Sequence, residues 1–341
     1  MTPAQLRALP ASVGVFTRES LAAHFGLPTV LFTQRGPTGP IVFHQGGAII
    51  PESYRLRGAI FWPKSKRVIP GIPQTLPSSD HTTEPAAVHN DRAFLDFLAD
   101  GEAVIETREP GVAVRLYQHA GRPFFATHST SDGHDPLLGA GIENVRTLGL
   151  DFGGQARRLC DQLCPKAYRL AALGYILVFV LLLPERDTLP QADHPDLVLV
   201  NVIDPDYEFV DRLEKERIAA DYGLNLVAQH GRIGNIGSNA DYFGRLRALE
   251  LTAAQNDGPG YIVKAVNEDG EQLSVVAESS SSRSWPQRFD EFDLKAARET
   301  ILEDFGNAII PPTLLEELML EYLGSRRRSV RWQIAKWIEQ L

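Results

Sequence analysis

The sequence contains one stretch that decides its fold class, Tyr175-Ile-Leu-Val-Phe-Val-Leu-Leu-Leu183. It is the longest apolar run of the chain, yet a helix needs roughly 20 residues to cross a bilayer, so we expect no membrane span. Its β-branched and aromatic side chains indicate a buried strand instead. A second apolar run, Leu197–Ile203, predicts another strand. A chain of 341 residues can bury a sizeable core around such strands.

Outward from these strands, periodicity and turn residues predict an alternation of helices and strands. On the C-terminal side we expect helices at Glu208–Ala220 and Ala240–Gln255, a strand at Leu224–Gln229, and a hairpin of Gly260–Asn267 with Gln272–Ala277 around an Asp-Gly turn. On the N-terminal side we expect helices at Pro3–Leu9, Arg18–Phe25 (capped by Thr17), Arg92–Leu98 and Gly154–Leu170, and strands at Thr29–Phe32, Ile41–Phe43, Gly58–Trp62, Ala103–Glu106, Val112–Gln118 and Pro123–His128.

These elements predict an α+β fold with two domains. A mixed body spans residues 1–285 and ends in the short linker Ser279–Ser284, and a small all-α domain spans residues 286–341. The net charge of −9 argues against a protein that coats nucleic acid through bulk charge. Two cysteines, Cys160 and Cys164, cannot build a disulfide framework or a four-ligand zinc site, so we expect them in a helix core and the protein in the cytoplasm.

Five segments, in this order and spacing, resemble the T-even phage RNA ligase family of the covalent nucleotidyltransferase superfamily. They are Leu56–Phe61, Ile105–Tyr117 with Pro123–Thr130, Gly174–Arg186, Asp196–Asp204 and Gly258–Val266. The resemblance covers most of the chain between Tyr54 and Ala277. It implies a nucleotidyltransferase domain of mixed, mainly antiparallel sheets flanked by helices, in a phage-related protein.

The resemblance also implies a chemistry whose key residues are missing. Such ligases attack ATP with the lysine of a Lys-x-Asp-Gly motif, and the matching residues here are Arg108-Glu-Pro-Gly111. Arginine stays protonated at any usable pH and cannot act as an amine nucleophile. None of the seven lysines in the chain has glycine three residues later. We therefore expect no lysine–AMP chemistry by the family route.

Other family positions are replaced as well. Val180 stands where the family has a glutamate, and Pro259 replaces the glutamate of a Glu-Gly pair. Ser274 and Val276 replace the lysines of a Lys-x-Lys strand. Nucleophile, metal ligand and phosphate clamp are thus lost together, which predicts a pseudoenzyme without catalytic residues, metal or cofactor. An active nucleotidyltransferase with altered chemistry or misread motifs is the alternative.

We expect a ligase-like protein that has lost its catalytic residues to act by binding a ligand or partner. Arg108, Arg115 and His128 are candidates for holding phosphate, ATP or another nucleotide, whereas Val180 and Pro259 favour a pocket closed by apolar groups. In the tail, RNA or a protein partner is expected to meet a basic and aromatic set, with a helix docked on its own domain as the alternative. This set is Arg326, Arg327, Arg328, Arg331, Trp332 and Trp337.

Three further patterns have simpler interpretations. Gly231-Arg-Ile-Gly-Asn-Ile-Gly237 is glycine-rich like a phosphate-binding loop but lacks Gly-Lys-Ser/Thr, so we predict a connecting loop. The polar residues between Asp80 and Asp91 match no metal-ligand spacing. Glu102, Glu106 and Glu109 are interpreted as surface charges of a hairpin, although altered chemistry would use Glu106 and Glu109 with Arg108 and His128.

Overall fold

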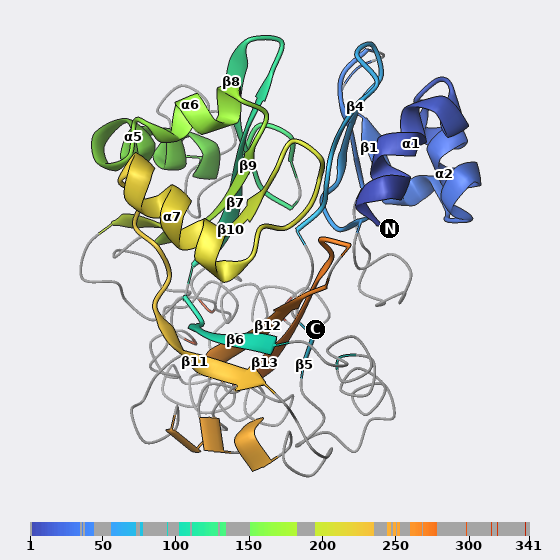
Figure 1. Ribbon diagram of the computed structural model, residues 1–341. Coiled ribbons are helices and arrows are strands. Elements are labelled where there is room, and N and C mark those ends of the chain that lie inside the picture. The colour runs from blue at the N-terminus through green and yellow to red at the C-terminus, as the bar shows by residue number, and fades with distance from the viewer. Residues whose placement is uncertain are drawn as a thin grey trace.

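The computed structural model shows an α+β protein built around three sheets (Figure 1). It describes residues 2–34, 36, 38–43, 56–72, 76–77, 94, 102–109, 111–128, 130–133, 151–182, 195–234, 244–246, 248–249, 251–252, 260–267 and 269–277, with single positions at 298, 315, 319 and 338. The predicted C-terminal domain, its boundary and the Arg326–Trp337 set therefore lie outside the described residues. No helix within the described part of the chain is long and apolar enough to span a membrane.

The N-terminal part is a four-stranded antiparallel sheet with two helices beside it. Its strands follow the chain order β1 (Phe32–Gln34), β2 (Ile41–Phe43), β3 (Ile60–Trp62) and β4 (Arg67–Ile69). Helices α1 (Pro3–Val13) and α2 (Arg18–Phe25) begin at capping boxes, and Thr17 caps α2 as predicted. The strand predicted from Thr29 is wrong at its start, because Thr29–Leu31 forms a 3₁₀ turn and the strand begins at Phe32.

The central sheet has the order β10-β9-β7-β8 and is antiparallel throughout. It contains β7 (Val112–His119), β8 (Arg122–Ala126), β9 (Ile176–Leu182) and β10 (Asp196–Ile203), close to their predicted bounds. Helices α5 (Phe152–Leu163) and α6 (Ala167–Ala172) pack on this sheet in one large apolar core. The single predicted helix is thus two, since Cys164 ends the first, and both cysteines are buried as expected.

The third sheet has the order β11-β6-β12-β13-β5. Its strands are β5 (Leu76–Pro77), β6 (Glu102–Thr107), β11 (Gln229–Gly234), β12 (Tyr261–Val266) and β13 (Gln272–Ala277). The predicted hairpin is confirmed as β12 and β13. The predicted loop at Gly231 is wrong in its first part, because Gly231–Gly234 pairs with β6 as part of β11; the remainder lies outside the described residues. Residues 225–228 carry no strand, so the strand expected at Leu224–Gln229 begins only at Gln229.

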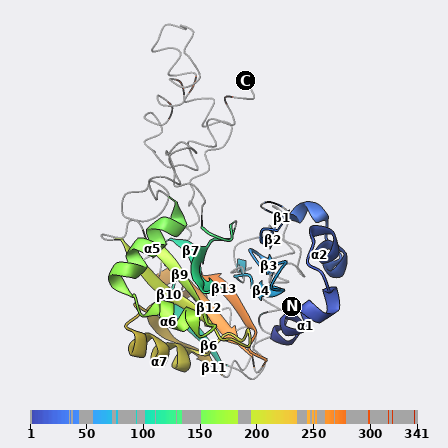
Figure 2. The same cartoon turned by 90° about the horizontal axis from the view of Figure 1, so that it is seen from above.

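Helix α7 (Arg212–Tyr222) joins the central sheet to the third sheet. It follows β10 along the chain and lies above β6 and β11 in Figure 1. The view from above shows α5, α6 and α7 on one side of the molecule and the N-terminal sheet with α1 and α2 on the other (Figure 2). This placement sets the side chains of α7 over one face of the third sheet, where the charged residues described below converge.

Candidate functional site

The two faces of the third sheet differ in polarity. Side chains alternate along β6, so Ala103 and Ile105 enter an apolar core while Val104 and Glu106 face the other way. On β12, Val263 and Ala265 share that core, and Lys264 faces the side of Glu106. The face that carries Glu106 and Lys264 is covered by α7, so its charges are withdrawn from water.

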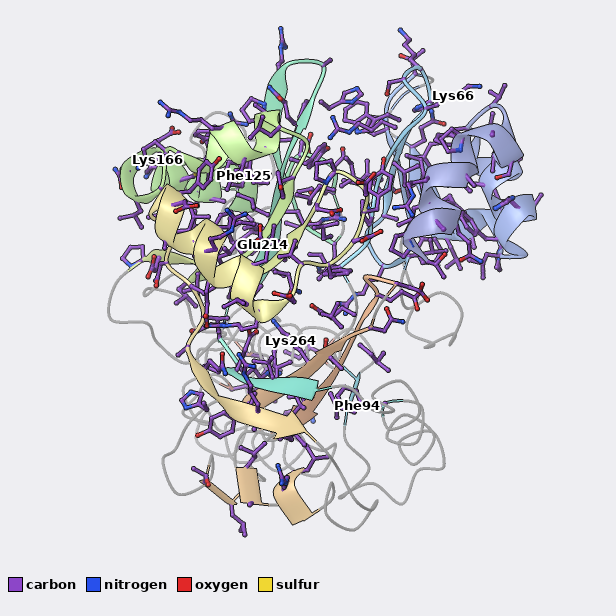
Figure 3. All side chains as sticks on the ribbon, in the orientation of Figure 1. Lys66, Phe94, Phe125, Lys166, Glu214 and Lys264 are labelled. Carbon is purple, nitrogen blue, oxygen red and sulfur yellow. The ribbon has the colours of Figure 1, made fainter. Side chains whose placement is uncertain are left out.

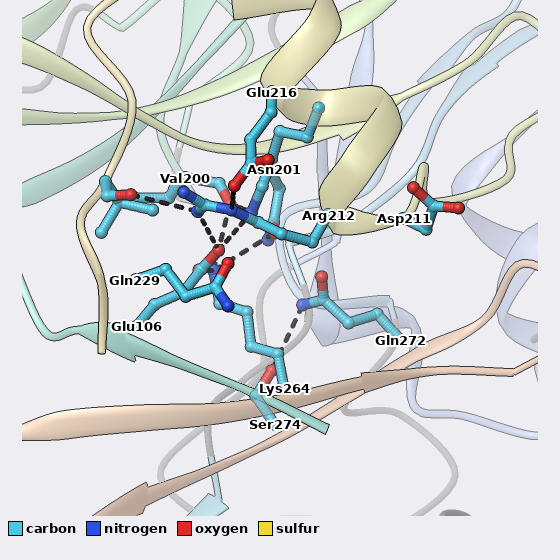
Figure 4. Close-up of polar contacts among 12 residues, drawn as sticks. Glu106, Val200, Asn201, Asp211, Arg212, Glu216, Gln229, Lys264, Gln272 and Ser274 are labelled. Carbon is cyan, nitrogen blue, oxygen red and sulfur yellow. Dashed lines mark hydrogen bonds and ion pairs between the residues drawn. The ribbon is translucent and has the colours of Figure 1, made fainter. Parts of the chain in front are cut away.

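Glu106 is the centre of this polar face and is 1% exposed. Its Oε1 lies 2.5 Å from Nζ of Lys215 and 2.8 Å from a terminal nitrogen of Arg212, and its Oε2 lies 2.6 Å from Nζ of Lys264 (Figure 4). The interpretation of Glu106 as a surface charge is therefore wrong. A buried carboxylate is stable only when ionic and hydrogen-bonding partners replace water, and here three cations do so.

The two lysines are also held by main-chain and amide oxygens of β10. Lys215 Nζ donates to the carbonyl of Val200 at 2.9 Å. Lys264 Nζ donates to the same carbonyl at 3.1 Å and to Oδ1 of Asn201 at 3.3 Å. Figure 3 shows Lys264 on its strand directly beneath the central sheet. The cluster thereby connects β6, β10, β12 and α7 through charge-assisted hydrogen bonds.

Helix α7 presents two cations to Glu106 because of how its first turn is built. Asp211 caps the helix by accepting the N–H of Glu214 at 2.8 Å. Arg212 follows in the first turn, donates to Val227 at 3.0 Å, and is paired through Nε with Glu216 at 2.7 Å. Lys215 lies on the buried stripe of the helix, which also carries Ile218 and Ala219.

Burial and the neighbouring charges shift the pKa values of Glu106 and Lys215. Burial alone would raise the pKa of Glu106, but the positive charges of Lys264 and Lys215 outweigh it and lower that pKa to about 2. Burial lowers the pKa of Lys215 to about 7, and the like charge of Lys264 acts in the same direction against the opposing pull of Glu106. At neutral pH the cluster therefore holds a firm carboxylate beside an amine that readily loses its proton.

A cavity of about 290 Å³ opens beside the cluster. Its polar lining runs from buried Glu106 to exposed Arg232, so it reaches the surface. The other polar groups of the lining are Asp211, Arg212, Lys215, Lys264 and Gln272. Among the described residues, no three His, Cys, Asp or Glu side chains lie together as a candidate metal site. The cavity is thus rich in cationic donors, a chemistry that suits anions.

The positions singled out by the resemblance lie on two different sheets. The N–H of Arg108 donates to the carbonyl of Gly260 at 3.1 Å, which joins the nucleophile position to the Pro259-Gly260 pair, although Pro259 itself lies outside the described residues. A Cβ at Gly111 would lie 2.4 Å from Cγ1 of Val180, so the glycine is needed for this close approach. On β13, Ser274 pairs with Lys264 and Val276 pairs with Ile262.

Arg115 is held in place by backbone carbonyls of three segments. Its guanidinium is fully buried and donates to the carbonyls of Pro70 and Gly58, each at 2.5 Å, and of Thr127 at 3.0 Å. Burial lowers its pKa to about 10, so it remains charged at neutral pH. A phosphate would have to displace these carbonyls, and we therefore interpret Arg115 as a structural residue that ties the central sheet to the N-terminal sheet.

The other sequence-derived candidates lie apart from the cavity. His128 is exposed, and Gly58 approaches its backbone closely, with a Cβ there only 2.8 Å from Cα of His128. Arg108 is half-buried and is not part of the cavity lining that the described residues form. Glu109 is half-buried too, and burial together with the charge of Asp196 raises its pKa. Their roles in phosphate binding or altered chemistry stay predictions.

Sequence reasoning missed Lys215, Lys264 and Arg212 as site residues. A signal was present for the lysines. Lys264 is the only charged residue in the strand Tyr-Ile-Val-Lys-Ala-Val, and Lys215 lies on the helical stripe of Ile218 and Ala219. A lysine at an apolar position is rarely buried without a partner, so each pattern predicts a buried counter-charge. The partner could not be named without the fold.

Comparisons with known proteins agree with this fold. No protein-family model and no curated protein matches the sequence. A solved archaeal ATP-dependent RNA ligase superposes with a TM-score of 0.51 at 11% identity, over 95% of this chain and 79% of that chain. A second form of an archaeal ATP-dependent RNA ligase gives a TM-score of 0.44 at 13% identity, over 95% of this chain and 79% of that chain. A Naegleria gruberi RNA ligase gives 0.41 at 12% identity, over 66% of each chain.

The first of these likenesses shows the fold alone. The described body has the nucleotidyltransferase architecture of ATP-dependent ligases, as the resemblance in sequence implied. Membership of the T-even phage family, and the loss of activity within it, remain predictions.

Proposed function

We propose that this chain is a catalytically inactive relative of RNA ligases that binds phosphate-bearing RNA without forming a lysine–AMP bond. One observation carries the proposal. The position of the family's nucleophile holds Arg108, and the two lysines on the neighbouring sheet face, Lys215 and Lys264, both make ion pairs with Glu106. A guanidinium stays protonated at any usable pH and has no lone pair with which to attack a phosphate, and each ion pair with Glu106 favours the charged form of its lysine.

The remaining chemistry of the site suits binding. Cations from two strands and one helix surround a cavity in the ligase fold, at a place where removal of water strengthens their attraction for an anion. Arginine and lysine donors recognise phosphate through charge-assisted hydrogen bonds. Such a site holds a ligand without changing it.

Incubation with α-³²P-labelled ATP and Mg²⁺ or Mn²⁺, followed by denaturing electrophoresis, tests the proposal. We expect no label on the protein, with an active ATP-dependent RNA ligase labelled in parallel. Fluorescence anisotropy should then show binding of short 5′-phosphorylated RNA. A covalent adduct would refute the inactive assignment, and absence of RNA binding in the unlabelled protein would leave a protein partner as the ligand class and refute the RNA role.

A second candidate is an active nucleotidyltransferase that uses a different lysine. The observation that favours it is that Lys215 lines the cavity and has its pKa lowered to about 7, since burial and Lys264 both disfavour its charge. If label does appear, peptide mapping shows whether the labelled residue is Lys215 or Lys264. Substitution Lys215→Met should abolish a Lys215 adduct, whereas Lys64→Met, at an exposed position, should leave it intact.

A further inference from the structure

Two hairpins meet at the end of the molecule that lies away from the third sheet. Figure 1 shows the turn between β3 and β4 and the turn between β7 and β8 at this same end. Trp62 at the end of β3 and His119 at the end of β7 stack with ring centroids 3.7 Å apart and an angle of 14° between the ring planes. Arg67 of β4 donates from its guanidinium to the carbonyl of Gln118. The stacked pair is half-buried, so part of its surface meets solvent.

The charge at this end is opposite in sign to that of the whole chain. The chain has a net charge of −9, whereas residues 60–69 and 112–126 contain five lysine or arginine residues and no aspartate or glutamate. Arg122 lies opposite His119 in the β7–β8 ladder, so both side chains are on one face of the hairpin. Lys66, in the other turn, and Arg122 are exposed, and no ion pair joins either of them to a carboxylate in the part of the chain that the structure describes. Positive charge is thus available to a ligand beside a stacked aromatic pair.

We infer that this end of the molecule binds an unpaired segment of RNA, with one base stacked on the Trp62–His119 pair and the adjoining phosphates beside the exposed cations of the two turns. The inference goes beyond the proposed function, from which it takes only the class of ligand, because none of these residues lines the cavity next to Glu106. A single RNA strand fits both features, since its bases offer flat rings and its phosphates offer negative charge. A duplex fits poorly, because its bases stay stacked on one another.

The state of His119 suits stacking against a base. Burial and the charge of Arg67 lower the pKa of His119, so its ring is uncharged at neutral pH. A neutral ring loses less hydration than a charged one when a base covers it. Trp62 also packs with Phe124 in the apolar core that the N-terminal and central sheets share, whereas His119 is not part of that core. His119 is therefore the residue whose exchange tests the ligand contact with the least disturbance of the fold.

Fluorescence anisotropy with the full chain tests the inference. The probe is a labelled octaadenylate RNA with a 5′-hydroxyl end, so that no terminal phosphate contributes to binding. An octamer of abasic ribose phosphates carries the same backbone charge without bases. We expect the octaadenylate to bind at least about fivefold more tightly than the abasic octamer, which is the lower limit of what the stacking of one base contributes.

His119 is exchanged in a matched pair of variants. His119→Leu has an apolar side chain of similar size without a ring, and it should weaken octaadenylate binding at least about fivefold, to the level of the abasic octamer. His119→Phe keeps a flat ring and should bind as the parent protein does. Thermal unfolding followed by circular dichroism checks that both variants are folded. A merely structural role of His119 predicts equal RNA binding by the two folded variants.

Arg122→Gln tests the charged part of the surface. Loss of one phosphate contact should weaken octaadenylate binding and lower the slope of log affinity against log salt by about 0.7. Arg245→Gln is the matched control, because Arg245 is an exposed arginine next to Leu246 in the core of the third sheet, and it should behave as the parent protein.

Three results overturn the inference: absence of octaadenylate binding by the parent protein, equal affinity for the octaadenylate and the abasic octamer, or unchanged binding by His119→Leu. None of them bears on the proposed function. That function fails instead on a labelled lysine, or on absence of binding to 5′-phosphorylated RNA.

Discussion

Arg115 and Glu106 are both buried in the described part of the molecule, and the groups that replace water around them differ. Arg115 donates to three backbone carbonyls, at Gly58, Pro70 and Thr127, and so joins two sheets. Glu106 is surrounded by side-chain cations from α7 and β12. Carbonyl oxygens do not titrate, so the contacts of Arg115 persist across the ordinary pH range. Among the three cations around Glu106, Lys215 has its pKa lowered to about 7 by burial and by Lys264, so this site can respond to protons and ligands.

This contrast teaches where function is to be sought in this fold. Both residues lie on strands next to Arg108, yet the terminal nitrogens of Arg115 donate to backbone carbonyls, whereas Glu106 has an excess of opposite charge around it beside a cavity. Contacts to the backbone indicate a structural role. An excess of buried positive charge favours the binding of a negatively charged ligand.

The largest expected effect comes from removal of the Glu106 charge. Glu106→Gln keeps the shape of the side chain but leaves Lys215, Lys264 and Arg212 facing each other out of water. Loss of one member of a buried ion pair typically costs about 3–5 kcal/mol. Chemical denaturation at pH 7 should show a loss of this size in the free energy of unfolding.

The same measurement has a matched control on the same helix. Glu214 pairs with Arg217 at 2.6 Å, but both side chains are exposed to solvent. Glu214→Gln should therefore change the free energy of unfolding little, because exposed pairs are screened by water. Equal effects of the two glutamine substitutions would show that water reaches the Glu106 cluster and screens its charges as it does those of Glu214 and Arg217.

A somewhat smaller effect is expected from Arg115→Met. The substitution keeps much of the apolar stem but leaves three carbonyls without a donor, and an unsatisfied buried polar group costs about 1–3 kcal/mol. Relaxation and entering water will offset part of this, so we expect a loss of about 2–4 kcal/mol in the free energy of unfolding. Because no titrating partner is involved, the loss should be equal at pH 6 and pH 9.

Arg157→Met provides the comparison for Arg115. Arg157 also donates to a backbone carbonyl, that of Pro123 at 3.2 Å, but its side chain is exposed. Its loss should leave stability nearly unchanged. A strong pH dependence of the Arg115→Met effect would contradict the structural role and restore Arg115 as a candidate for anion binding.

Much of the fold was predictable because its strands have strong local signals. The apolar runs of β9 and β10, the Asp-Gly turn between β12 and β13, and the cap at Thr17 each specify their element within a few residues. Predictions failed where tertiary pairing decides. Gly231–Gly234 is glycine-rich and looks like a loop, yet it forms a strand because β6 offers it a partner edge.

The candidate site was less predictable, because burial of charge depends on what lies across the fold. Glu106 follows an apolar strand in a charged turn region, which is typical of a surface position, and only the placement of α7 makes it buried. The ion-pair partners of Glu106 lie far from it in the sequence, so no local sequence pattern predicts these contacts.

The smallest expected effect, and the one that separates the two kinds of burial most sharply, is that of Lys215→Met. The folded pKa of Lys215 is lowered to about 7 by burial and by Lys264, whereas the unfolded chain has the ordinary value of about 10.4. Between these values the unfolded state binds more protons than the folded state, so this group makes stability rise with pH from about 7 to about 10. Below pH 7 the folded protein must carry the unfavourable charge in full.

Methionine cannot carry that charge, while Arg212 and Lys264 still neutralise Glu106. Removal of the excess cation should therefore raise the free energy of unfolding at pH 6 by about 1 kcal/mol, since apolar replacement of a surplus buried ion is often stabilising. At pH 9, where Lys215 is already neutral, the lost hydrogen bonds to Glu106 and Val200 should make the change zero or slightly negative. Denaturation at the two pH values measures this change of sign. A loss of stability at pH 6 that exceeds the loss at pH 9 would mean that Lys215 is a needed counter-ion of Glu106. The cations around Glu106 would then be structural partners, as the carbonyls around Arg115 are.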